Sequence, residues 1–106
     1  MSTIRRKSIN FTIVPSEPDG GEPIERTYAN FCAVSHTPFD FTLTFCDMQP
    51  MGEREVREAE STHTVKAPVK ARLVVPVQMI PGLVAALQEN FRLFQEAYGP
   101  PKGTLH

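Results

Sequence analysis

The side chains of this sequence that could do chemistry lie mainly in its central third. They are two cysteines, Cys32 and Cys46, with His36 and Asp40 between them, and a second histidine, His63, further along. Opposed thiols can form a disulfide or a redox switch, and thiolates with imidazoles can bind zinc. The two cysteines lack the Cys-x-x-Cys spacing typical of zinc sites. The sequence therefore favours free buried thiols, since cysteine packs as a small apolar side chain, and leaves a redox pair and a metal site open.

The histidine lies in the segment Ser35-His36-Thr37-Pro38. An imidazole there could act as a ligand or general base, but Ser, His and Thr side chains also hydrogen-bond the backbone of turns. Asp40 is explained in the same way, as a turn acceptor. No nucleophile with a paired base is recognisable, so we expect no catalytic, cofactor-binding or metal-binding residues and no enzyme. A candidate turn motif remains: Ser35, His36, Pro38 and Asp40.

Length and charge exclude several classes of function. The chain has 106 residues and a net charge of −1, which gives no electrostatic case for nucleic acid or an anionic membrane. No apolar run reaches the ~20 residues that span a bilayer, and the N-terminus lacks the apolar core of a signal peptide. We therefore expect a cytoplasmic protein with reduced cysteines. Residues 1–8 are expected to form a flexible N-terminal tail, 9–99 a single α+β domain, and 100–106 a C-terminal tail.

Four strands and one helix are expected to position these residues. Alternation of apolar and polar residues predicts strands at 9–14, about 24–35, about 39–46 and about 65–75. The charged connection 47–63 is interpreted mainly as a solvated loop. The final helix should begin between Val77 and Ile80, because Pro81 fits only its first turn, and should stop at Gly99. The fold class is therefore α+β: an antiparallel four-stranded sheet, a hairpin-centred meander, with one long C-terminal helix packed on one face.

The two faces of the central hairpin follow from the length assumed for its turn. The expected turn is the three-residue loop His36-Thr37-Pro38, and an odd-length loop puts odd residues of both strands on one face. This face would be the core, formed by Ala29, Phe31, Ala33, Phe39, Phe41, Leu43 and Phe45. The helix would cover this face with an apolar stripe of Val84, Leu87, Phe91, Phe94 and Tyr98. The opposite face has few charges, which is typical either of strand residues in general or of a surface covered by another subunit. It is the candidate interaction face, formed by Tyr28, Asn30, Cys32, Val34, Thr42, Thr44 and Cys46.

Several segments resemble a known bacterial family. Tyr28-Ala29-Asn30-Phe31, the run from Val34 to Leu43, and Ala86-Leu87-Gln88-Glu89-Asn90 with a closing Gly99 are similar to the signature of domain of unknown function 3467. The resemblance covers about residues 24–99. It implies a small cytoplasmic bacterial domain without an assigned activity, and it supplies no catalytic residues. A weaker resemblance, in element order alone, is to the SecB export chaperone, an oligomer with a four-stranded sheet and a long C-terminal helix.

These observations lead to three functional hypotheses. The first is a non-enzymatic protein that acts through homo-oligomerisation, as a dimer or larger assembly, and through protein–protein interaction, as a scaffold or adaptor. The alternative is a SecB-like chaperone that binds unfolded polypeptide. The second alternative is a small metal or redox site near the turn, formed by Cys32, Cys46 and His36. None of them involves nucleic acid or a membrane.

Overall fold

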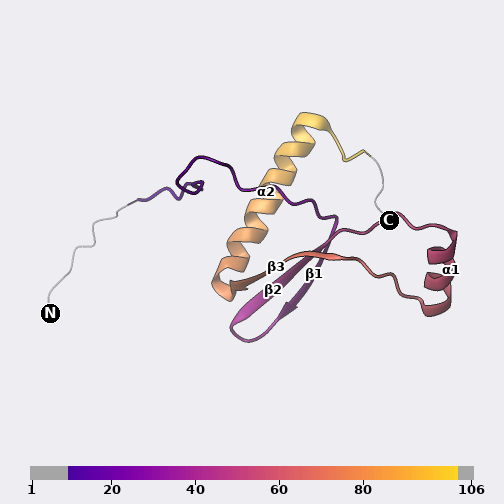
Figure 1. Cartoon of the computed structure of the whole chain (residues 1–106). Coiled ribbons are helices and arrows are strands. Elements are labelled where there is room, and N and C mark those ends of the chain that lie inside the picture. Colours follow the sequence, from indigo (N-terminus) through magenta and orange to yellow (C-terminus); the bar gives the residue numbers. More distant parts are fainter. Residues whose placement is uncertain (1–9, 103–106) are drawn as a thin grey trace.

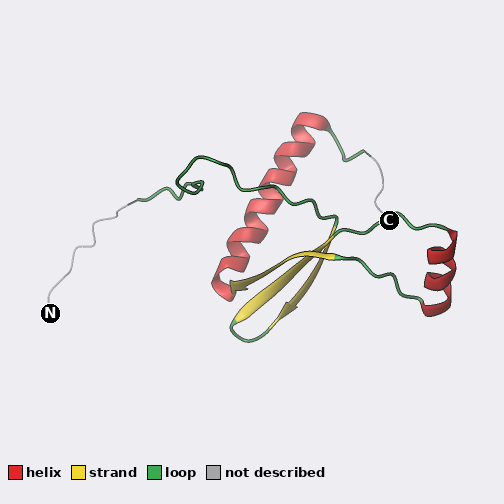
Figure 2. Ribbon diagram, in the orientation of Figure 1, coloured by secondary structure: helices red, strands yellow, loops and turns green. Residues whose placement is uncertain are grey.

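A computed structural model describes residues 10–102 of the chain. Strands β1 (Phe31–His36) and β2 (Asp40–Cys46) are followed by helix α1 (Glu53–Thr62), strand β3 (Val69–Pro76), a 3-10 turn η1 (Val77–Met79) and helix α2 (Ile80–Tyr98). The strands form one antiparallel sheet in the order β1-β2-β3, and α2 leaves from its end (Figure 1; Figure 2). The predicted α+β class, antiparallel meander and C-terminal helix are confirmed. The predicted tail at 1–8 lies outside the described residues, and the extent of the domain stays a prediction.

The strand predicted at 9–14 is wrong for the part of this segment that the structure describes. Residues 10–14 have no regular structure, and Phe11 and Ile13 are 84% and 94% exposed. Apolar alternation specifies which side of a strand is buried, but a strand also needs a sheet edge to satisfy its backbone hydrogen bonds. Within one chain, this segment has no such edge beside it. The sheet in residues 10–102 therefore has three strands, and β1 begins at Phe31 rather than near Ile24.

The turn between β1 and β2 is organised by Thr37. Its hydroxyl donates to Asp40 Oδ1 at 2.8 Å and accepts hydrogen bonds from the backbone N–H groups of Phe39 and Asp40 at 3.1 and 3.2 Å. The Thr37 N–H donates to the Asp40 carbonyl at 2.9 Å. Residues 37–40 thus close as a four-residue connection, and His36 pairs with Phe41.

This turn makes the predicted face assignment wrong. In the observed register Cys32 lies opposite Phe45, and Val34 lies opposite Leu43. Directly paired residues share a face, so even residues of β1 lie with odd residues of β2. The expected three-residue loop would have paired even with even. One extra residue in the turn exchanges the two faces of β1, because side chains alternate with a period of two.

Helix α1 was interpreted mainly as loop, and that interpretation is wrong. Glu53 and Glu55 occupy its first turn, where negative charge complements the helix dipole. Arg54 and Glu58 form an i,i+4 ion pair at 3.5 Å. His63 ends the helix in the left-handed conformation, and its N–H donates to the Ala59 carbonyl. Helix-favouring residues with an acidic first turn formed a helix here without a buried apolar stripe.

Helix α2 begins and ends where the sequence predicts, but it does not cover the sheet. The turn η1 starts at Val77, Pro81 lies in the first turn of α2, and Gly99 follows the last turn with φ 76°. No residue of α2 is buried, and its contacts with other elements are mainly with η1. Figure 1 shows the helix running away from the end of β3. The expected packing of this helix on one face of its own sheet is therefore wrong.

Removing the Thr37 hydroxyl from the turn should measurably lower the stability of the protein. Thr37→Val removes one donated and two accepted hydrogen bonds, each worth about 0.5–1.5 kcal/mol net and less when exposed. We expect the free energy of unfolding to fall by about 1–2 kcal/mol in urea denaturation at fixed protein concentration. Ser35→Ala, a control outside this network, should change it by less than about 0.5 kcal/mol. Equal losses in both variants would contradict the role assigned to Thr37.

Candidate interaction surface

One face of the sheet is apolar across all three strands. We call it the apolar sheet face. Leu43, at its centre, pairs with Val34 on one side and with Leu73 on the other. His36 stacks on Phe41, with ring centroids 5.4 Å apart. The face carries no Lys, Arg, Asp or Glu, and the register gives its members as Cys32, Val34, His36, Phe41, Leu43, Phe45, Ala71, Leu73 and Val75.

Much of the apolar sheet face is open to solvent. Leu43 and Val75 are buried, but Val34 and Leu73, on the two outer strands, are 58% and 51% exposed. The only other buried apolar residue in the described part of the chain is Cys46. A sheet face of this composition is normally covered, and exposed apolar surface of this kind is typical of interaction surfaces.

The observed strand register places the residues of the predicted interaction face on two different faces of the sheet. Cys32 and Val34 belong to the apolar sheet face, whereas Thr42, Thr44 and Cys46 lie on the opposite face. The opposite face is polar at its centre, where Arg72 Nε donates to Thr44 Oγ1 at 3.1 Å. The charge-poor surface does exist, but it includes Phe41 and Phe45, which were assigned to the core, whereas Phe31 lies on the opposite face.

The remaining two members of the predicted face precede β1. Tyr28 is 68% exposed. The Asn30 amide bonds the chain that follows β2: its Oδ1 accepts from the Met48 N–H at 2.7 Å, and its Nδ2 donates to the Met48 carbonyl at 3.2 Å. Asn30 thus extends the β1–β2 pairing beyond the last ladder residue. A structural role explains this residue.

The register also separates the residues proposed for a metal or redox site. Cys32 is exposed on the apolar sheet face, and Cys46 is buried on the opposite face. His36 shares a face with Cys32 but lies four residues along the same strand, which is about 13 Å. Within residues 10–102, no three His, Cys, Asp or Glu side chains gather as a metal site would require. The strand register thus keeps the side chains of Cys32, Cys46 and His36 apart.

The turn motif has a structural explanation. Asp40 accepts a hydrogen bond from the Thr37 hydroxyl, and His36 stacks on Phe41. Ser35 and Pro38 are exposed. Thr37, which the sequence motif left out, makes most of the hydrogen bonds. Its signal in the sequence was a hydroxyl residue three positions before Asp40, a spacing typical of side-chain-closed turns.

Helix α2 carries a second open apolar surface. We call the set Val84, Leu87, Phe91, Phe94 and Tyr98 the α2 stripe. Its members follow one another at alternating steps of four and three residues and lie on one side of the helix. The Phe94 ring packs against the rings of its helical neighbours Phe91 and Tyr98. The five side chains are between 40% and 72% exposed. The predicted stripe is present, and all five of its members are exposed within the described chain.

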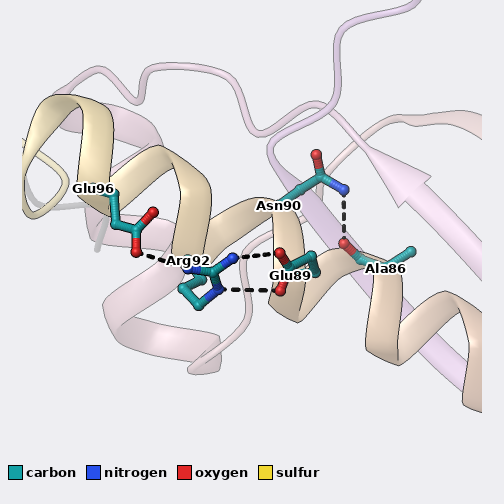
Figure 3. A network of polar contacts seen from close by, with 5 residues as sticks. All are labelled: Ala86, Glu89, Asn90, Arg92 and Glu96. Atoms are coloured by element: carbon teal, nitrogen blue, oxygen red, sulfur yellow. Dashed lines mark hydrogen bonds and ion pairs between the residues drawn. The ribbon is translucent and has the colours of Figure 1, made fainter.

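The other side of α2 is polar and internally paired (Figure 3). Arg92 donates to both oxygens of Glu89 and, at 2.7 Å, to Glu96 Oε1. The Asn90 amide donates to the Ala86 carbonyl. The hydrogen bonds from Arg92 lower the pKa of the Glu89 carboxyl, and the Glu89 carboxylate raises the pKa of Arg92. This side is suited to water, which leaves the α2 stripe as the side to be covered.

The total surface of the chain is far larger than that of a compact monomer. It is 10409 Å², whereas a compact protein of 11.8 kDa exposes about 5,900 Å². Exposed apolar side chains contribute to this excess, both before β1, where Phe11 and Ile13 are 84% and 94% exposed, and on the α2 stripe.

The ion pair between Glu89 and Arg92 predicts that the stability of α2 depends on pH. A depressed Glu89 pKa means that the stabilising effect of the pair is present above the unfolded-state pKa and is lost as the pH falls through the folded-state pKa. We expect NMR titration to give Glu89 a pKa below that of an unpaired glutamate, and Arg92→Ala to raise it. Arg54→Ala, which removes the ion pair in α1, should leave the Glu89 pKa unchanged. An unchanged Glu89 pKa in Arg92→Ala would contradict the pairing.

Comparison with known proteins adds family membership. No helix in residues 10–102 combines the length and apolar character needed to cross a membrane. No curated protein sequence and no solved structure matches the chain significantly. The profile of one family, described as "Protein of unknown function (DUF3467)", matches residues 4–102. This match spans nearly the whole chain, so the protein belongs to the DUF3467 family.

Proposed function

We propose that this protein is a non-enzymatic, cytoplasmic interaction module that works as a homo-oligomer, in the role of a scaffold or adaptor. The observation that carries the proposal is the open apolar surface. The apolar sheet face and the α2 stripe are both uncovered in the single chain. The two unpaired cysteines are compatible with a reducing compartment.

The energetics support association. Leu73, Leu87, Phe91 and Phe94 are each 40–62% exposed. Completing the burial of such side chains contributes on the order of 1 kcal/mol each, as about half of the 1.5–3 kcal/mol for full burial. Three buried apolar residues are a small core for a domain of this length. A second copy would supply the missing core, so folding and association are proposed to be coupled.

Two valines of similar exposure allow a matched test. Val34 lies on the apolar sheet face and is 58% exposed, and Val74 lies on the opposite face and is 64% exposed. We expect the wild type to have the mass of a dimer or larger assembly in light scattering. Val34→Asp should dissociate it or raise its dissociation constant at least about 100-fold, as expected for a charge buried in an interface.

Val74→Asp is the control and should keep the mass of the wild type. A monomeric, folded wild type at micromolar concentration would overturn the proposal. Equal dissociation by both variants would contradict the assignment to the apolar sheet face.

A chaperone that binds unfolded polypeptide is the second candidate. The same exposed apolar surface favours it, because large open apolar patches mark sites for other chains. The analogy with SecB is weaker than the sequence implied, since the described sheet has three strands.

This candidate predicts that stoichiometric amounts of the protein suppress aggregation of a thermally unfolded enzyme, measured by turbidity. Val34→Asp should lose at least half of this effect, and Val74→Asp should retain it. No suppression by the wild type would remove this candidate and leave the scaffold proposal standing.

A further inference from the structure

We infer that the α2 stripe of one chain covers the apolar sheet face of a second copy, so that two chains exchange their C-terminal helices. The inference rests on the proposed homo-oligomer and names the contact within it. Three observations lead to it: the direction in which α2 leaves the sheet, the residues that flank its stripe, and the dimensions of the two surfaces.

The path of α2 is fixed where it leaves β3. The turn η1 follows Pro76 directly, and the Ile80 N–H donates to the Val77 carbonyl, so no free loop separates strand from helix. The Val77 N–H donates to the Phe39 carbonyl at 3.3 Å, which ties this junction to the hairpin turn. A helix lying back over its own sheet would need a flexible connection here. Short, rigid connections of this kind favour exchange between copies.

The residues beside the stripe favour a sheet as its partner. In a two-helix coiled coil the positions flanking the apolar seam are typically charged. Here Gln88 and Gln95 flank one side, and Leu83, Asn90 and Ala97 flank the other. The charges of the helix, Glu89, Arg92 and Glu96, are held together on the remote side. A broad uncharged border is typical of a helix buried against a wide apolar layer.

The two surfaces have the same dimensions. The α2 stripe from Val84 to Tyr98 is about 21 Å long at 1.5 Å per residue. The central strand β2, with seven residues, is about 20–23 Å long. Three strands spaced by about 4.8 Å give a face about 10 Å wide between the outer strands, close to the 10–12 Å diameter of a helix. The α2 stripe of each chain would then cover the apolar sheet face of the other chain.

Disulfide formation between two single-cysteine proteins tests this contact. Both start from a chain with Cys32→Ala and Cys46→Ala; one then carries Leu73→Cys on the apolar sheet face, and the other carries Leu87→Cys in the α2 stripe. One of them carries a purification tag, so that the mixed product has its own mass. After mixing, unfolding and refolding together, mild oxidation should give the mixed disulfide as the main product, at least about fivefold above either self-pair. In place of Leu73→Cys, the control Val74→Cys on the opposite face should not cross-link with Leu87→Cys.

Each other outcome overturns the inference. A dominant Leu87→Cys self-pair would mean that two helices pack together, and a dominant Leu73→Cys self-pair would mean that two sheets do. A chain carrying both cysteines that forms its disulfide internally at the mass of a monomer would mean that α2 folds back on its own sheet. The first two results leave the homo-oligomer standing. Only a monomeric wild type removes both proposals.

Discussion

The four-residue turn that Thr37 closes determines the surfaces of this protein. Its hydroxyl binds Asp40 and two backbone N–H groups, and this sets His36 opposite Phe41. A connection of three residues would pair the strands one position differently. The side chains of β1 would then point to the opposite faces, because alternation along a strand has a period of two. This turn therefore decides which side chains of β1 lie on the same face as Phe41, Leu43 and Phe45 of β2.

With this register, apolar residues gather on one face of the sheet, and much of that face is exposed within residues 10–102. Val34 and Phe41 join Leu43 and Leu73 there, and the C-terminal helix, whose stripe has a matching size, points elsewhere. With three buried apolar residues among residues 10–102, the described chain has little burial to offset its conformational entropy. The open surfaces are therefore understood as parts of a core that two or more chains would complete. The same surplus of apolar surface underlies the chaperone hypothesis.

The potentially reactive side chains of the central hairpin have structural explanations. Cys32 and Cys46 face opposite sides, and Asp40 holds the turn. Asn30 bonds the backbone of Met48 and so continues the pairing of β1 and β2. The strand pairing and the turn contacts make the hairpin the organising element of the sheet. Its role is to set the strand register and the apolar face rather than to gather reactive groups.

The sequence by itself determined the local structure. Alternating residues predicted the three observed strands, Pro81 and Gly99 bounded the final helix, and the spacing of Leu87, Phe91 and Phe94 predicted its stripe. These features depend on neighbours in the chain, which the sequence displays directly. The length of the turn had a local signal, Thr37 three positions before Asp40, which the predicted loop did not use. The faces of β1 and the position of α2 were decided by tertiary structure, because they follow from the cross-strand register and from a junction at Val77 that is tied to Phe39. Helix α1 was interpreted as loop because it has an acidic first turn and an ion pair but no apolar stripe. On our proposal a second copy covers the hairpin's apolar face, and a contact between two chains is not contained in the sequence or the fold of one chain.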